Sequence, residues 1–174
     1  PLGEANVSIA LLTPDLGLVR ARAQGLRRPG AKLAASLTTL AESEVVLVHG
    51  KESWRIAGAI LAENWFTRLH TAEARARAGR ICNLLLRLVA SEVHDTALFS
   101  VVRGFFGALA SLPEEMHEAA EVLAVLRSLA VLGFDAGVIP GEASMFTESV
   151  LAEVLKGRMQ YIARINNGLA ASGL

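Results

Sequence analysis

The sequence predicts an α+β protein in which a small β-barrel over residues 1–63 precedes an all-helical domain over residues 64–174. Apolar residues alternate with polar ones before about residue 64, as in strands, and recur at helical spacing after residue 70. Turns that contain glycine separate the strand-like stretches. The chain has 174 residues, of which 52% are hydrophobic, so it can bury one large core or two small ones, and general disorder is excluded.

Four stretches are expected to form the strands. Residues 7–11 and 18–24 alternate in polarity, and residues 45–48 form a largely β-branched run. A further extended stretch runs from Trp54 through Ala59, after the turn at residues 49–52. Short strands over about sixty residues are typical of a barrel of the OB type, which binds single strands of nucleic acid on an open strand face.

The first two helices are predicted from apolar stripes. Residues 81–88 carry apolar side chains at spacings of three and four, and residues 98–109 repeat the pattern. Asp95 or Thr96 is a suitable N-cap for the second of these helices.

Two more helices complete the predicted domain. Ser111 and Glu114 form a capping box that starts the third helix, which should stop at Gly133. The last helix is expected from about Thr147 through Ile165. Four helices with short loops predict an orthogonal or bundled domain.

A basic stretch at residues 17–32, GLVRARAQGLRRPGAK, contains five cationic side chains and no acidic one. They are Arg20, Arg22, Arg27, Arg28 and Lys32. Arg20 and Arg22 stand two residues apart, so both leave the same face of a strand. The other three lie in a predicted turn, where long side chains reach outward at no burial cost.

The region around Trp54 continues this basic character. Lys51 and Arg55 flank Trp54, which is suited either to stacking on a base or to filling a small core. Residues 17–58 contain seven Lys or Arg and three Glu, a balance of +4, although the whole chain has a formal charge of zero. Each cation that neutralises a phosphate releases counterions, so the region is suited to nucleic acid, although a solvated surface is the plainer interpretation.

Several functional classes are disfavoured. Arg87, Arg103 and Arg127 interrupt the longest apolar runs before the roughly 20 residues that a membrane-spanning helix needs. No signal-peptide pattern opens the chain, and one cysteine, Cys82, cannot form an internal disulfide, so a reducing cytoplasm is expected.

Catalysis is also not expected. The His94-Asp95 pair lacks the further ligands that a metal-dependent phosphohydrolase needs, and Cys82 lies in an apolar helix. No phosphate-binding glycine motif is present, so we expect a protein that is not an enzyme and that uses no cofactor or metal.

The order and spacing of several segments resemble the N-terminal domain of the bacterial RecO family of recombination mediators. The segments are PLGE at 1–4, LLTPDLGLVRARAQGLRR at 11–28, Lys32-Leu33, Leu37 and GKESWRIAGA at 50–59. VLRSLAVLGFD at 125–135 is similar to the Leu-rich helix of the family's helical domain. A short strand normally precedes the first segment in this family, so the first sheet is expected to lack part of an edge.

The resemblance implies a protein of DNA repair and recombination in the bacterial cytoplasm, associated with the nucleoid. It implies binding of single- and double-stranded DNA, annealing and, with RecR, loading of RecA onto DNA coated with single-strand-binding protein. Phosphates would be contacted by Arg20, Arg22, Arg27, Arg28, Lys32, Lys51 and Arg55, with Trp54 as a stacking residue.

A second implied partner is the acidic C-terminal tail of single-strand-binding protein, which would occupy a groove in the helical domain. Arg80, Arg87 and Arg103 are candidates for its basic rim. Some members carry a four-cysteine zinc site after the Leu-Gly, which this chain cannot form. The alternative is a noncatalytic helical protein-interaction module whose barrel docks another protein and does not bind DNA.

Overall fold

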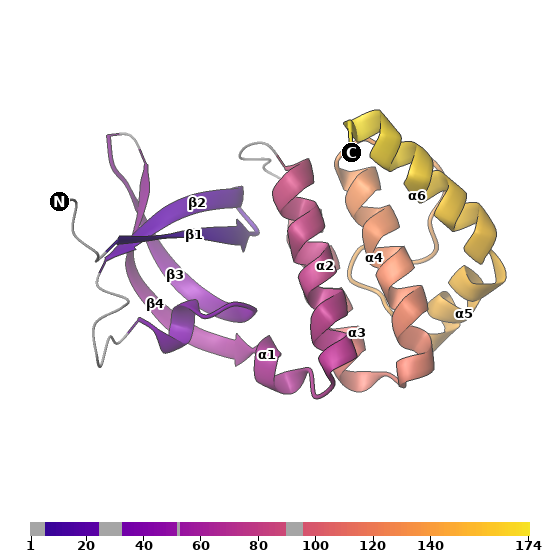
Figure 1. Ribbon diagram of the computed structural model, residues 1–174, viewed down its shortest axis with the longest axis horizontal. Coiled ribbons are helices and arrows are strands. Elements are labelled where there is room, and N and C mark those ends of the chain that lie inside the picture. The colour runs from indigo at the N-terminus through magenta and orange to yellow at the C-terminus, as the bar shows by residue number, and fades with distance from the viewer. Residues whose placement is uncertain (1–5, 25–32, 52, 90–95) are drawn as a thin grey trace. The chain divides into compact units, whose positions relative to one another are not determined.

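The computed structural model describes residues 6–24, 33–51, 53–89 and 96–174, and these form four strands and six α-helices (Figure 1). The predicted α+β class is therefore confirmed. The chain divides into two units, one of residues 1–12 and 18–68 and the other of residues 13–17 and 69–174. In the described part of the chain, no helix combines the length and apolarity needed to cross a membrane.

The four predicted strands are all present. They are β1 (Asn6–Thr13), β2 (Gly17–Gln24), β3 (Ala41–His49) and β4 (Trp54–Asn64), and their order in the sheet is β1-β2-β4-β3. β3 and β4 form an antiparallel hairpin, while β4 pairs in parallel with β2. The last strand therefore lies between the second and the third, an arrangement that local alternation of polarity does not encode.

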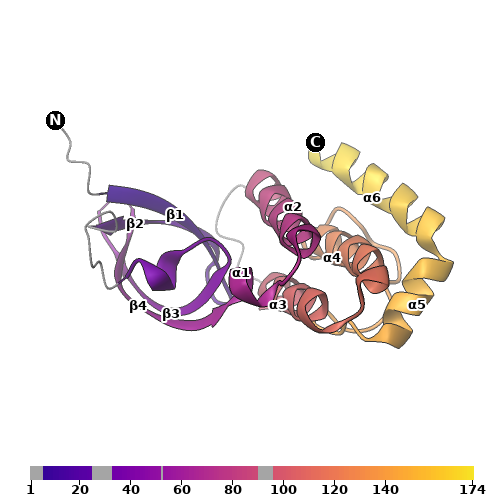
Figure 2. The same cartoon turned by 60° about the horizontal axis from the view of Figure 1, so that its bottom comes forward.

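The OB-type barrel is not confirmed, because the described strands form an open sheet. β1 and β3 are its two edges, and closure would require pairing between the outer strands in a staggered register. The strands are nevertheless strongly curved (Figures 1 and 2). Two irregularities in the β3–β4 register, between Glu42 and Ser43 and between Val46 and Leu47, introduce extra residues on β4 and add to the twist.

The core of the sheet is built from small side chains. Ala21, Ala23 and Ile56 are buried, and partly buried apolar residues of β1, β3, β4 and the 3-10 turn at Ala35–Leu37 pack against them. At the far end of the hairpin, α1 (Trp65–Arg68) continues β4, and the Trp65 indole Nε1 donates a hydrogen bond of 2.9 Å to Glu42 Oε2. The change from strand to helix thus occurs at Asn64 and Trp65.

The helical unit is arranged around α4. Its elements are α2 (Ala72–Leu88), α3 (Thr96–Ser111), α4 (His117–Val131), α5 (Glu148–Lys156) and α6 (Arg158–Ser172). α4 packs against α2, α3, α5 and α6, and both views show it between α2 and α6 (Figures 1 and 2). The predicted apolar stripes are buried, with Ile81 and Leu85 of α2 and Leu98 and Phe105 of α3 in the core.

Two helix boundaries differ from the prediction. Ser111 ends α3 instead of capping the next helix, and its hydroxyl donates to the Gly107 carbonyl at 2.8 Å. The chain then passes through a short 3-10 turn at Glu114–Met116 before α4 begins. The predicted final helix is two helices separated at Gly157, where an added Cβ would lie 2.8 Å from the Tyr161 ring.

Other boundaries agree with the prediction. Gly133 follows α4 with φ of +81°, a left-handed conformation that favours glycine, and Phe134 N–H donates to the Leu129 carbonyl at 2.8 Å. Thr147 caps α5 through its side chain. The proposed cap at Asp95 lies outside the described residues, whereas Thr96 is the first residue of α3.

Candidate nucleic-acid interface

One face of the sheet exposes the cations of β2. Val19, Ala21 and Ala23 are buried, whereas Arg20, Arg22 and the neighbouring Gln24 are exposed. The alternation arises because successive side chains of a strand point to opposite faces, and the alanines fit the narrow core. The prediction that Arg20 and Arg22 leave the same face is therefore confirmed.

The strand register brings a third cation to this exposed face. Arg22 of β2 is the partner of Arg55 of β4, and Arg55 is in turn the partner of Val48 of β3. Neighbouring strands lie about 4.8 Å apart, so the two arginines emerge side by side. Like charges in such positions destabilise a sheet, and an anion between them relieves the repulsion.

A shallow cleft of 380 Å³ lies at this point, between the end of β2 and the β3–β4 turn. Its lining consists of two arginines, polar side chains, one aliphatic side chain and the turn itself: Arg22, Gln24, Val48, His49, Gly50, Ser53 and Arg55. The Gly50 N–H donates to the Ser53 carbonyl at 3.0 Å and closes the turn. The exposed Lys51 belongs to the same turn.

The sequence reasoning did not identify Gln24, Val48 and Ser53 as members of this group. Gln24 continues the alternation of Arg20 and Arg22, so its position on the face could have been inferred from the sequence. Val48 and Ser53 reach the cleft through the pairing of β4 with both neighbours, for which the sequence carries no local signal.

The cations of the exposed face differ from those of the helical unit in their partners. Arg20, Arg22, Lys51 and Arg55 form no ion pair with any residue that the structure describes. Several arginines of the helical unit are paired: Arg77 and Arg80 with Glu121 and Glu73, Arg158 with Glu118, and Arg164 with Asp135.

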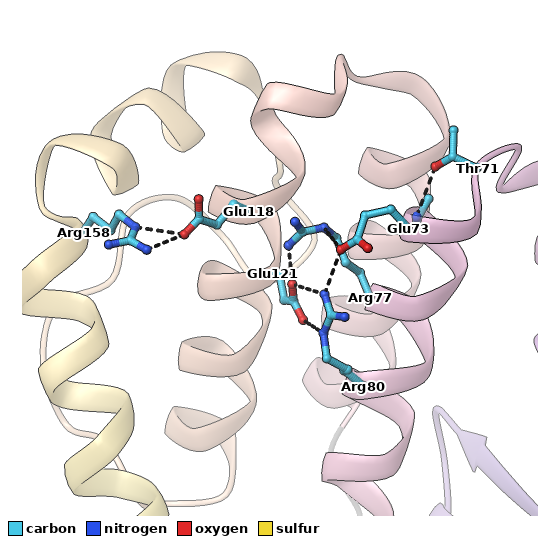
Figure 3. Close-up of polar contacts among 8 residues, drawn as sticks. Thr71, Glu73, Arg77, Arg80, Glu118, Glu121 and Arg158 are labelled. Atoms are coloured by element: carbon cyan, nitrogen blue, oxygen red, sulfur yellow. Dashed lines mark hydrogen bonds and ion pairs between the residues drawn. The ribbon is translucent and has the colours of Figure 1, made fainter.

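Figure 3 shows how α4 pairs with α2 through Glu121 and with α6 through Glu118. Glu121 accepts hydrogen bonds from both Arg77 and Arg80, with 2.6 Å between Arg80 Nε and Glu121 Oε1. The hydrogen bond from Arg80 to Glu121 raises the pKa of the guanidinium above its usual range. On the other side, Glu118 accepts from Arg158 Nε at 2.9 Å. These arginines therefore have carboxylate partners within the helical unit.

Trp54 lies on the opposite face from Arg55. It is the register partner of Ala21, is half-buried, and packs against the cluster of Ala21, Ala23 and Ile56. The His49 ring meets it edge-on, with 4.7 Å between ring centroids. This environment corresponds to the core-filling alternative and not to an open stacking surface.

The remaining predicted contact residues have different outcomes. Arg27, Arg28 and Lys32 lie outside the described residues. Of the predicted rim, Arg87 is exposed on α2 and Arg103 is exposed on α3, while Arg80 is held by Glu121. The rim assignment stays a prediction.

The cysteine and the metal-ligating residues form no comparable site. Cys82 is half-buried in α2, and burial raises the pKa of its thiol, which disfavours the reactive thiolate. Among the residues that the structure describes, no group of three His, Cys, Asp or Glu side chains is placed to hold a metal ion.

Comparison with known proteins identifies a set of related sequences. The chain is 33% identical over 100 residues to the DNA repair protein RecO of Dehalococcoides mccartyi, which covers 58% of this chain and 40% of that protein. It is 33% identical over 135 residues to the DNA repair protein RecO of Thermobifida fusca, covering 76% and 55% of the two chains.

A third relative, the DNA repair protein RecO of Bifidobacterium adolescentis, is 30% identical over 144 residues, covering 76% of this chain and 54% of the relative. The chain therefore spans about half the length of the curated relatives that it matches. No protein-family model matches the chain.

Proposed function

Because the chain belongs to the RecO family of DNA repair proteins, we propose that it is a noncatalytic recombination mediator that binds DNA on the exposed face of its sheet. The observation that carries this proposal is a set of cations without described partners on the exposed face and in the adjoining turn: Arg20, Arg22, Lys51 and Arg55, of which Arg22 and Arg55 line the cleft. Side chains of this kind gain most from an external polyanion, because no internal carboxylate has to be displaced.

Both single- and double-stranded DNA present the phosphates that these cations would neutralise. Arg22 and Arg55 emerge from adjacent strands and can hold one phosphate between them, while Arg20 and Lys51 continue the basic surface toward the β3–β4 turn. Phosphate contacts fix the position of a nucleic acid without reading its sequence. Such binding suits a protein that holds two strands for annealing.

The sheet is proposed to be the open form of an OB-type barrel. Its strong curvature and the placement of β4 between β2 and β3 support this assignment. The exposed face of such a barrel is the surface on which nucleic acid binds.

The partners are proposed from the family. Together with RecR, the protein would help RecA replace single-strand-binding protein on gapped DNA, in the bacterial cytoplasm at the nucleoid. The acidic tail of single-strand-binding protein would meet the exposed Arg87 and Arg103 of the helical unit together with Arg80, which also donates hydrogen bonds to Glu121.

The experiment is fluorescence anisotropy of a labelled 20-nucleotide strand at several salt concentrations. The Arg20→Gln, Arg22→Gln, Arg55→Gln variant should lose most of its affinity, and the slope of log K against log salt should fall by about two, since each phosphate contact to a single strand contributes roughly 0.7. A control with the same change of net charge carries Arg87→Glu and Lys156→Gln in the helical unit, at two exposed positions outside the ion pairs described above.

Equal losses in both variants would show that net charge alone governs binding and would contradict the assignment to the sheet. If the folded wild-type protein binds no DNA even at low salt, the sheet is a protein-docking surface, as in the alternative interpretation.

A further inference from the structure

The exposed face of the sheet also carries three aliphatic side chains. Val46 is 60% exposed, Val48 is 40% exposed and Ile60 is 71% exposed. Single exposed apolar residues are common on proteins, but several on one face of adjacent strands mark a binding surface.

The strand register joins this aliphatic strip to the basic cleft. Val48 is the partner of Arg55 and lines the cleft with Arg22. Two residues further along β3, Val46 is the partner of Gly58, and Ile60 follows Gly58 by two residues on the same face of β4. The aliphatic strip, defined as Val46, Val48 and Ile60, is therefore continuous with the two arginines.

Gly58 keeps the strip open. A Cβ added at Gly58 would lie 3.9 Å from Val46 Cγ2, in ordinary van der Waals contact, so any larger residue there would cover part of the Val46 side chain. Glycine weakens a strand and often marks a place where another molecule approaches closely.

The strip and the cations occupy neighbouring parts of the exposed face. Arg22 and Arg55 come from β2 and the start of β4, whereas Val46 and Val48 come from the edge strand β3 and Ile60 from further along β4, opposite the exposed Glu44. A ligand that fits has a negatively charged edge over Arg22 and Arg55 and an apolar surface over Val46, Val48 and Ile60. Glu44 would repel a phosphate at the β3 edge and so fixes this orientation.

We propose that the aliphatic strip contacts the bases of an unpaired DNA strand whose phosphates lie on Arg22 and Arg55, so that the face prefers unpaired strands to duplex. In a duplex the base faces are stacked inside the helix and cannot reach Val46, Val48 or Ile60. Trp54 supports the sheet from the other side and does not stack on the bases. This inference rests on the proposed DNA binding.

The test compares three ligands: a 20-residue thymidine strand, a strand of the same length with abasic tetrahydrofuran units, and a blunt hairpin duplex. The Val46→Thr, Val48→Thr, Ile60→Thr variant keeps β-branched side chains at exposed positions and so preserves the strand. A matched control, Val46→Ile, Val48→Ile, Ile60→Val, keeps the strip aliphatic.

The wild type should bind the thymidine strand about fivefold or more tightly than the abasic strand, because the bases cover exposed apolar surface. The threonine variant should bind the two strands equally while its affinity for the hairpin is unchanged, and the control should keep the wild-type difference. Equal binding of both strands by the wild type, or equal losses for all three ligands in the threonine variant, would overturn the inference and leave DNA binding intact. Absence of any binding by the wild type would overturn the proposed function itself.

Discussion

Arg127 is the most deeply buried cation that the structure describes, and its replacement by methionine tests how the helical unit holds its longest connection. The residue is 4% exposed in the middle of α4. Its guanidinium donates to the carbonyls of Pro140 at 2.6 Å, Ala143 at 3.1 Å and Met145 at 2.9 Å, and it lies 4.8 Å from the centre of the Phe146 ring. The α4–α5 connection is therefore folded around one side chain.

The stability contribution of Arg127 is the balance of two large terms. Burial lowers the pKa of Arg127 to about 10, which corresponds to a desolvation cost of about 3 kcal/mol while the group stays charged at neutral pH. Three hydrogen bonds from a charged donor contribute roughly 1.5–3 kcal/mol each. The bonds exceed the cost, so Arg127→Met should lower the free energy of unfolding by about 3 kcal/mol.

Thermal and urea unfolding followed by circular dichroism measures this difference. For a chain of this size, about 3 kcal/mol corresponds to a fall in Tm of roughly 6–12 °C. Arg127→Lys should be intermediate, because an ammonium group cannot reproduce the planar fork. Arg87→Met, at an exposed position of α2, should change the stability by less than about 0.5 kcal/mol.

Limited proteolysis adds a local readout, since residues 137–146 should be cleaved faster in the Arg127→Met protein. An Arg127→Met protein as stable as the wild type would contradict this prediction, because it would mean that the hydrogen bonds to the carbonyls only offset the desolvation of the charge.

Three further predictions concern other contacts. Glu121→Gln should lower the free energy of unfolding by about 1–3 kcal/mol, because Glu121 and its partner Arg77 are largely buried. Glu118→Gln, at the exposed pair with Arg158, should lower it by less than about 1 kcal/mol. Urea unfolding measures both values. The hydrogen bond from Arg164 lowers the pKa of Asp135 below its usual 3.8. The stability that this pair contributes is therefore present above pH 3.8 and is lost as the pH falls through the lowered pKa. In acid titration, the Asp135→Asn protein should lose less stability over this range than the wild type. In a Trp65→Phe protein Trp54 is the sole tryptophan, and its emission should change little when unpaired DNA binds, whereas quenching by more than about half would indicate stacking on a base.

The side chains on the exposed face of β2 could be predicted from the sequence, because the alternation of side chains between the two faces depends only on residues within the strand. Once residues 18–24 are assigned to a strand, the buried alanines fix where Arg20 and Arg22 point. The cleft could not be predicted in the same way, since Arg55 and Val48 join Arg22 only through the parallel pairing of β2 with β4. Pairing depends on contacts between distant segments, which the alternation of one strand does not specify.

The charge composition of the sequence indicated the exposed cations of the sheet, but it did not indicate which arginines of the helical unit form ion pairs. The balance of +4 over residues 17–58 corresponds to cations without described partners, as at Arg20 and Arg22. In the helical unit, Arg80 is a candidate for the basic rim, and it is also a donor of hydrogen bonds to Glu121 of α4, which the sequence does not indicate. A stripe shows which side chains are buried, but it does not show which of the others meet a carboxylate on a neighbouring helix.

An arginine that interrupts an apolar run of the sequence can be either exposed or buried in the fold. Arg87 and Arg127 both interrupt such runs, but Arg87 is exposed and Arg127 is buried. Leu126 and Ser128, the chain neighbours of Arg127, are fully buried, and Arg127 itself is 4% exposed. A buried guanidinium needs acceptors within the protein, and the carbonyl oxygens of the α4–α5 connection supply them without a carboxylate. The segment after Gly133, with one proline, two glycines and two charged residues among residues 134–146, provides such carbonyls. A buried arginine before a connection of this composition therefore predicts a loop folded around the side chain.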